Sequence, residues 1–426
     1  MPEIHPISGA CVWHGREMAN SPRWRRLLGD AQLAEIDRAV RQASARGLGW
    51  QTMTAEDFPL PSCVDLAEDI RAELEDGSGI VLLQGLDPSR YSLDELKLLY
   101  AAIARQVGNF VYSNRAGEVM REIRDVGRDG GRQAVQRYGA LPEREGAFLS
   151  SYARTLSNGS LRFHTDRCDV VALFCVRQAA RGGLSQLCSS PTVHNAMLER
   201  RPDLCAALYE HFWRSRFGEE DATNNSAYPL PVWGVRDGKF TSHYSRTYIE
   251  AAQLRPEGEV PRVSDSQWQA LDLLAKLAEE LCFEMSFAPG DIQFVNNHVI
   301  YHARSAFEDD DEGHDRLLLR LWLSMPNSRT LPAGHEVLWR AIEAGALRGG
   351  IGQSGVPVWQ PLASPPRLEI ELVVSGTKPV ITAPIVGATK LNHLDDALAS
   401  VNVKLSADEI TSLEEPYVPH AVVGFV

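Results

Sequence analysis

No stretch of the sequence approaches the roughly 18 uncharged apolar residues that a membrane-spanning helix requires, although 44% of the 426 residues are hydrophobic. The first residues, Met1 to Pro6, contain neither a basic start nor an apolar run, so the features of a secretory signal are missing. These two absences predict a cytoplasmic protein without a membrane partner.

Positive charge and paired cysteines are also scarce. The chain carries 43 Lys and Arg against 56 Asp and Glu, a formal net charge of -13. Such a balance argues against nucleic acid as a partner. The seven cysteines include no C-x-x-C pair, which favours reduced thiols over a disulfide framework or a zinc site. We therefore expect Cys168 to be a packing side chain rather than a metal ligand.

Two separated segments do carry residues suited to a metal. The first contains His164 and Asp166, and the second contains His302. Two imidazoles and one carboxylate suit a mononuclear non-haem iron(II) site and leave positions open for co-substrate and oxygen. In an extended strand, residues i and i+2 point to the same side, so His164 and Asp166 can bind one ion while Thr165 faces away. The third ligand must come from a distant strand, and we expect it to be His302.

Each of these signals is weak alone. With 12 His and 56 acidic residues in the chain, some His-x-acid pairs arise by chance. A single His in an apolar stretch is more often a hydrogen-bonded core residue than a ligand. On composition alone, His298 and His314 remain alternatives to His302.

Four motifs in a fixed order strengthen the interpretation. They are Phe163-His-Thr-Asp166, Asn296-Asn297, His302-Ala-Arg304 and Arg316-Leu-Leu-Leu-Arg320-Leu-Trp322. Over about residues 60–330, the chain resembles the taurine dioxygenase and clavaminate synthase-like group of 2-oxoglutarate-dependent oxygenases. The resemblance implies an α+β fold, with a double-stranded β-helix (jelly-roll) core decorated by helices.

The same resemblance implies an Fe(II)/2-oxoglutarate-dependent dioxygenase. Such an enzyme uses oxygen and converts 2-oxoglutarate to succinate and CO2 while it hydroxylates or desaturates a small organic substrate. His164, Asp166 and His302 are implied as its metal ligands and catalytic residues. Arg316 would bind the distal carboxylate of 2-oxoglutarate through its guanidinium fork. Ser185, which follows a Gly-Gly pair, would share that carboxylate.

Three further residues are candidates for contact with the substrate. Arg320 lies on the same strand face as Arg316, where it would form either an ion pair or a contact to an anionic group of the substrate. Asn158 belongs to a Ser-Asn-Gly-Ser segment that favours an irregular loop. Arg246 belongs to the segment of residues 242–248, whose hydroxyl groups could line the pocket with it. Together they suggest an anionic or amino-acid-like small molecule, whose identity the sequence does not give.

Local patterns predict several elements around these motifs. Capping boxes at Ser92 and Ser264 predict helices that begin there. Asp237-Gly238 predicts the turn of a hairpin. A long loop or lid is expected over residues 110–150, where no periodicity stands out. Strands are expected at 79–86, 283–287, 292–295 and 317–323, and a further helix near 192–210.

The C-terminal part suggests a short β/α appendage. We expect an oxygenase domain over residues 1–349, a linker over 350–375 and a separate segment over 376–426. That last segment resembles the C-terminal end of aldo-keto reductases, in which residues 387–390 would help to hold the adenosine phosphate of NADPH. The preceding strands and catalytic residues of that family have no counterpart here, so we expect no reductase activity. A non-catalytic barrel that only binds ligand, and an NADPH-linked reductase chimera, are the alternatives.

Overall fold

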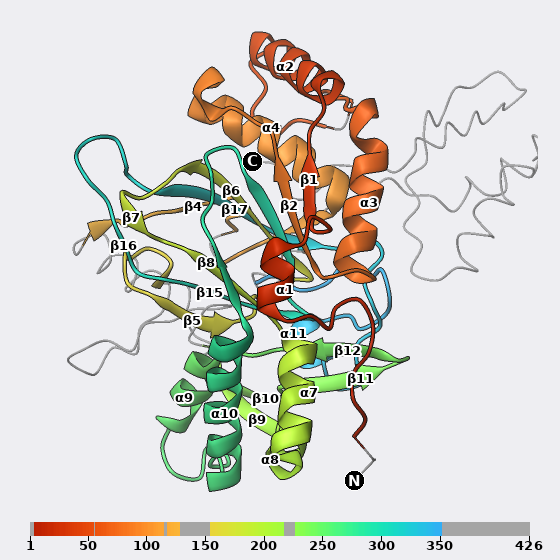
Figure 1. Cartoon of the computed structure of the whole chain (residues 1–426), viewed down its shortest axis with the longest axis vertical. Coiled ribbons are helices and arrows are strands. Elements are labelled where there is room, and N and C mark those ends of the chain that lie inside the picture. Colours follow the sequence, from red (N-terminus) through yellow and green to blue (C-terminus); the bar gives the residue numbers. More distant parts are fainter. Residues whose placement is uncertain (1–3, 55, 115–116, 128–153, 217–225, 352–426) are drawn as a thin grey trace, which may run out of the picture. The chain divides into compact units, whose positions relative to one another are not determined.

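The computed structural model describes residues 4–54, 56–114, 117–127, 154–216 and 226–351. The described residues form two β-sheets that pack against each other, with helices on both outer sides (Figure 1). Of the linker predicted over residues 350–375, only Gly350 and Ile351 are described, and the reductase-like segment predicted over residues 376–426 lies outside the described residues. Within those residues, no helix combines the length and the apolar character needed to cross a membrane.

The larger sheet has seven strands in the order β1-β2-β14-β6-β17-β3, and β4 also pairs with β17. All eight residues of β17 are buried, which is why this strand is an almost unbroken apolar run in the sequence. The strands are β1 (Arg25–Leu27), β2 (Ile80–Gln84), β14 (Ile292–Asn296), β6 (Val170–Arg177), β17 (Leu317–Ser324), β3 (Asn109–Val111) and β4 (Arg121–Ile123).

The smaller sheet has four antiparallel strands in the order β13-β8-β15-β5. Three further strand pairs lie outside the two sheets. The four strands are β13 (Phe283–Met285), β8 (Ser185–Ser189), β15 (Ile300–Arg304) and β5 (Leu161–His164). The pairs are β7 (Arg181–Gly182) with β16 (Phe307–Glu308), β9 (His211–Ser215) with β10 (Ala227–Pro231), and β11 (Trp233–Arg236) with β12 (Lys239–Ser242).

Helices close the two outer sides of this arrangement. One hydrophobic core joins α2, α3 and α4 to the larger sheet, and another joins α7, α8 and α10 to the smaller one. Figure 1 shows these two groups of helices at opposite ends of the two packed sheets. The helices are α1 (Gly15–Asn20), α2 (Asp30–Ala45), α3 (Val64–Glu75), α4 (Leu93–Val107), α7 (Ser190–Arg200), α8 (Pro202–Ala207), α9 (Arg246–Gln253), α10 (Asp265–Leu281) and α11 (Glu336–Trp339).

Alternation along β17 determines which of its side chains face the inside of the sandwich. Leu319 and Leu321 belong to the core shared with α2–α4, whereas Leu318 and Trp322 belong to the core between the two sheets. Because successive side chains of a strand point to opposite faces, Arg320 also points between the sheets. The strand thus places a charged side chain inside the molecule.

The local predictions agree with most of these elements. The capping boxes at Ser92 and Ser264 are confirmed, and so is the hairpin turn, where Asp237 has a φ of 51°. The helix predicted near 192–210 is two helices that meet at Arg201, because the residue before a proline avoids the helical conformation.

Two expectations need correction. The region 110–150 was expected to be one long loop, but β3 ends within it and β4 lies inside it, and both pair with β17. Residues 128–153 lie outside the described part. The strands described here form separate sheets rather than a closed barrel.

Candidate active site

Three side chains meet between the two sheets. His164 ends β5 and is the direct cross-strand partner of His302 on β15, with ring centroids 4.3 Å apart. Asp166 follows two residues later, and its Oδ1 lies 3.8 Å from Nε2 of His164. Its Oδ2 lies 4.0 Å from Nε2 of His302. One potential ligand atom from each residue lies within 4.8 Å of the others, a spacing that a single metal ion could bridge.

The path of the chain to Asp166 differs from the expected one. The sequence predicts a strand that carries both His164 and Asp166, but β5 ends at His164 and Asp166 lies in the turn that follows. The hydrogen bonds of the sheet therefore do not fix its backbone. The turn is held instead by contacts such as that from the Asp166 amide to Oδ1 of Asn297, over 2.9 Å.

The hydrogen bonds and charges of the cluster prepare it for a cation. Nδ1 of His164 lies 2.9 Å from the carbonyl oxygen of Arg162, so this nitrogen carries the hydrogen and Nε2 is left free to coordinate. Burial, together with the neighbouring His164, lowers the pKa of His302 to about 3, despite the opposing charge of Asp166. Burial alone would raise the pKa of Asp166, but the charge of Arg320, together with the neighbouring His302 and His164 and the hydrogen bond from Trp322, outweighs it and lowers that pKa. A neutral His302 and an ionised Asp166 are the forms that bind metals.

A cavity on one side of the cluster contains the residues expected to bind 2-oxoglutarate. Arg316 is 5% exposed and forms no ion pair with any described acidic residue. Its Nη1 has no hydrogen-bond partner among the described residues, and burial lowers its pKa to about 10. Ser185 shares this cavity and donates a hydrogen bond to Oε1 of Gln293 over 3.2 Å. A buried guanidinium without a counter-ion favours an anionic ligand.

A second cavity adjoins the first and also reaches His164 and Asp166. Arg320 lines both cavities and is 5% exposed. Its Nη1 lies 3.6 Å from Oδ2 of Asp166, while its Nε and Nη2 have no hydrogen-bond partner among the described residues. Other polar residues of this second cavity include Arg167, Arg216, Thr155, Thr165, Ser215, His243, Ser245 and Tyr248.

Two predicted substrate residues lie elsewhere. Asn158 lies on an exposed loop and lines neither cavity, although its carbonyl oxygen accepts a hydrogen bond from the amide of Phe307. Arg246 donates to Glu250 over 2.7 Å, also pairs with Asp272, and lines a separate groove. For Arg246, the structure therefore favours an ion-paired role.

The two alternative histidines are engaged in other contacts. Nε2 of His298 lies 2.8 Å from Oδ1 of Asp169, and its Nδ1 lies 2.7 Å from Oγ1 of Thr241. His314 is exposed and pairs with Asp310. Among the described residues, only His164, Asp166 and His302 form a group that could hold a metal.

Sequence reasoning gave no individual role to several residues around the cluster. Nε1 of Trp322 donates a hydrogen bond to Oδ2 of Asp166 over 2.9 Å, and the Asn297 side chain holds the turn. Trp322 and Asn297 both occur in the motifs that carry the family resemblance. Those motifs pointed to the region of the site but did not indicate that these two side chains hold Asp166. Asp169 and Arg348 gave no signal at all.

Comparison with known proteins assigns the family. Residues 44–322 match the family described as "Taurine catabolism dioxygenase TauD, TfdA family", and the chain belongs to this family. The chain is 27% identical over 333 residues to FR-33289 synthase of Streptomyces rubellomurinus, and the aligned region covers 77% of this chain and 93% of that relative. It is 29% identical over 304 residues to taurine hydroxylase-like protein SAT17 of Stachybotrys chartarum, over 71% and 75% of the two chains. The protein is therefore an oxidoreductase of the dioxygenase class.

A solved structure shares the fold. Asparagine oxygenase, determined in complex with Fe(II), hydroxyasparagine and succinate, has a TM-score of 0.52 at 14% identity and covers 76% of this chain and 100% of its own. A separate short match, 56% identical over 39 residues, is to versiconal hemiacetal acetate reductase of Aspergillus parasiticus, over 9% of this chain and 11% of that protein.

Proposed function

We propose that this chain is an Fe(II)- and 2-oxoglutarate-dependent dioxygenase that oxidises a small organic acid. One observation carries the proposal: His164, Asp166 and His302 offer ligand atoms within 4.8 Å of one another, beside the buried Arg316, whose Nη1 has no hydrogen-bond partner among the described residues. Family membership agrees with it. Hydroxylation is the expected outcome, and desaturation is the alternative.

The residues of the cluster fit iron(II). Two imidazole nitrogens and one carboxylate oxygen are the ligand set of non-haem iron oxygenases and leave coordination positions for co-substrate and oxygen. His164 is oriented by its hydrogen bond to the Arg162 carbonyl, and Asp166 by that from Trp322. Iron(II), when bound, would supply the activation of oxygen, coupled to conversion of 2-oxoglutarate to succinate and CO2.

Arg316 and Ser185 are proposed to bind the distal carboxylate of 2-oxoglutarate. Both line the cavity that also reaches His302, so a dicarboxylate could extend from the cluster to the guanidinium. A bidentate pair between a guanidinium and a carboxylate has the required geometry. It would also give Arg316 the counter-charge that no described residue supplies.

Arg320 is proposed to orient an anionic group of the substrate. It lies where the two cavities meet, and two of its nitrogens have no hydrogen-bond partner among the described residues. A substrate anion there would lie close to the metal ligands. Asn158 and Arg246 line neither cavity, so they are left out of this proposal.

The domain limits are proposed with one change. We interpret the two sheets as the halves of a jelly-roll core and extend the oxygenase domain to Ile351, whose amide donates to the carbonyl oxygen of Tyr112 over 2.8 Å. Residues 376–426 are proposed to be an aldo-keto reductase-like fragment without reductase activity. A cofactor site cannot be built from the last part of that fold alone.

The experiment that tests the function measures succinate formation and oxygen consumption. The full chain is supplied with Fe(II), 2-oxoglutarate and a panel of candidate organic acids, and His164→Ala serves as the inactive control. We expect acid-stimulated succinate release in the wild type and none in the variant. No succinate with any acid, despite binding of 2-oxoglutarate, would favour the non-catalytic alternative.

A further inference from the structure

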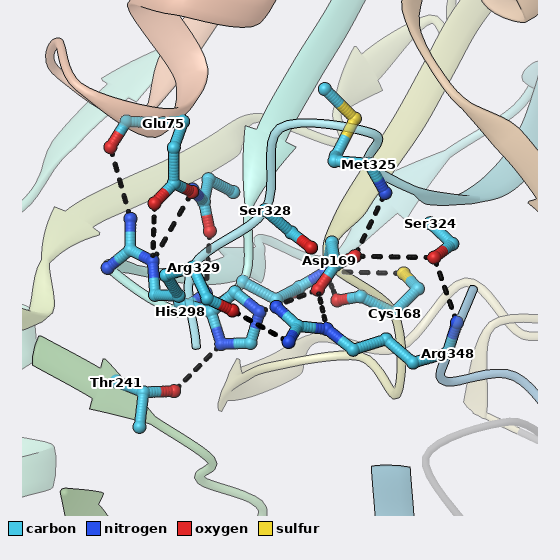
Figure 2. Close-up of polar contacts among 12 residues, drawn as sticks. Glu75, Cys168, Asp169, Thr241, His298, Ser324, Met325, Ser328, Arg329 and Arg348 are labelled. Carbon is cyan, nitrogen blue, oxygen red and sulfur yellow. Dashed lines mark hydrogen bonds and ion pairs between the residues drawn. The ribbon is translucent and has the colours of Figure 1, made fainter. Parts of the chain in front are cut away.

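A second group of buried charges surrounds Asp169, three residues after Asp166 (Figure 2). The side chains of Asp169 and Arg348 are 2% and 0% exposed, and those of Glu75 and Arg329 are 8% and 3% exposed. Nε of Arg348 lies 2.8 Å from Oδ1 of Asp169, and Nε of Arg329 lies 3.0 Å from Oε1 of Glu75. These are two buried ion pairs in one network.

Asp169 is the centre of the network. Besides Arg348, its Oδ1 accepts a hydrogen bond from Nε2 of His298, and its Oδ2 accepts one from the amide of Met325 over 2.9 Å. Figure 2 shows these side chains converging on the carboxylate. Burial alone would raise the pKa of Asp169, but Arg348 and the hydrogen bond from His298 outweigh it and lower that pKa.

Arg348 comes from a segment far along the chain. Its Nη1 donates to the carbonyl oxygen of Arg329 over 2.7 Å, and its amide donates to Oγ of Ser324 over 3.0 Å. Two residues later, the amide of Gly350 donates to the carbonyl oxygen of Arg167 over 2.6 Å. This segment therefore contacts the turn of residues 166–169 at both a side chain and a backbone carbonyl.

Asn297 holds the same turn from the other side. Its Oδ1 accepts a hydrogen bond from the backbone amide of Asp166, and its Nδ2 donates one to the carbonyl oxygen of Cys168 over 3.0 Å. Its backbone amide donates a hydrogen bond to the carbonyl oxygen of Asp169 over 2.9 Å. The contacts from Asn297 and from Gly350 together involve a backbone group of every residue in the turn of residues 166–169.

Space around the turn is also restricted. Gly349 has a φ of +76°, and a Cβ added there would lie 2.8 Å from the carbonyl oxygen of Arg167 and 3.2 Å from Cα of Cys168. Only glycine allows both this backbone conformation and this close approach. The segment of residues 348–350 therefore packs directly against the chain that carries Asp166.

We propose that Asp169 and Arg348 are positioning residues that hold Asp166 opposite the two histidines of the candidate metal centre. The inference rests on the proposed metal-binding role of those three residues. Asp166 lies beyond the end of its strand, so contacts to the turn must fix its place. A buried ion pair is costly to desolvate and adds little net stability. The pair of Asp169 and Arg348 is therefore better explained by its effect on the position of Asp166 than by its contribution to stability. Arg348 lies outside the region matched to the family, residues 44–322.

The pair Glu75–Arg329 provides a control, since it is also buried but its side chains make no described contact with the turn. We would compare Arg348→Met with the double variant Glu75→Gln/Arg329→Met in the full chain. Two quantities would be measured for each: the Tm of the metal-free protein, and the affinity and absorption spectrum of bound Co(II), a substitute for Fe(II) that is stable in air.

We expect both variants to lower the Tm. Only Arg348→Met should weaken Co(II) binding, by about 10- to 100-fold, and alter the Co(II) spectrum. If Arg348→Met does not fold, Asp169→Asn and Arg348→Lys replace it, with the same expectation. Folded variants of Arg348 or Asp169 that bind Co(II) with unchanged affinity and spectrum would overturn the inference alone. Failure of the wild-type chain to bind Co(II) or Fe(II) would overturn the proposed function as well.

Discussion

Nε1 of Trp322 donates a hydrogen bond to Oδ2 of Asp166 over 2.9 Å, from a strand of the opposite sheet. Both side chains are buried, at 5% and 8% exposed. A charge-assisted bond of this kind fixes the rotation of the carboxylate and occupies one of its oxygens. The aromatic residue of the Arg-x-x-x-Arg-x-Trp motif thus has a defined contact with a candidate metal ligand.

Replacing Trp322 by Phe tests this contact, because it removes the indole donor and keeps an aromatic ring. We expect a loss of about 1–3 kcal/mol of stability in the metal-free protein and about tenfold weaker Co(II) binding. Trp233→Phe is the matched control, since its Nε1 donates to the Tyr301 hydroxyl instead. Equal Co(II) affinities in the two variants would argue against a role for Trp322 at the metal.

The proposed 2-oxoglutarate site makes a second prediction. Arg316→Met should raise the KM for 2-oxoglutarate by about 10- to 100-fold, because a hydrogen bond to a charged group contributes about 1.5–3 kcal/mol. Ser185→Ala should have a smaller effect, since its hydroxyl is neutral. The Tm of metal-free Arg316→Met should not fall, because the variant loses a buried charge that has no described counter-ion.

A shorter co-substrate provides the control for Arg316. 2-Oxobutyrate has the 2-oxo acid group of 2-oxoglutarate but no distal carboxylate. In the wild type, 2-oxobutyrate should compete only weakly with 2-oxoglutarate for the metal-loaded protein. The affinity for 2-oxobutyrate should be the same in Arg316→Met as in the wild type. An equal loss of affinity for both acids would show that Arg316 acts on the whole site rather than on one carboxylate.

Buried histidines predict a dependence of stability on pH. Burial lowers the pKa of His335 to about 4, against an ordinary value of about 6.5. Between these values the unfolded chain binds a proton that the folded chain does not, so the free energy of unfolding should fall as the pH decreases from about 6.5 to 4. Below that window, both states are protonated and His335 contributes no further loss.

Urea denaturation of the metal-free protein at pH 7 and pH 5 checks this dependence. His335→Gln should lose less stability between the two pH values than the wild type. His14 is exposed, so His14→Gln should follow the wild type. A dependence that His335→Gln leaves unchanged would assign the effect to other groups, such as His298, whose pKa burial also lowers to about 4.

The C-terminal part of the chain gives a last prediction. A chain that ends at Ile351 should keep 2-oxoglutarate turnover, whereas one that ends at Ile342 should lose it together with metal affinity, because it lacks Arg348 and Gly350. The full chain should not oxidise NADPH in the presence of carbonyl substrates. Iron-independent NADPH oxidation would contradict the proposed role of residues 376–426.

Local patterns accounted for much of the fold. The apolar run of β17, the capping boxes at Ser92 and Ser264 and the hairpin turn at Asp237 are each decided by residues close in sequence, so they could be predicted. The number of sheets and the short strand β4 could not, since they depend on pairing between distant segments. The placement of Asp166 beyond its strand was missed for the same reason.

For the candidate site, the sequence by itself determined which kinds of groups are available. Two imidazoles and one carboxylate suit iron(II), because residue type fixes what each group can bind, whereas the family resemblance implied His302 as the third ligand and Arg316 as a cation for a carboxylate. Only the tertiary structure decided which groups meet: it brought the three ligands within 4.8 Å of one another, kept Arg246 out of both cavities and joined Arg348 to Asp169. Such contacts join residues far apart in the chain, and no local pattern encodes them.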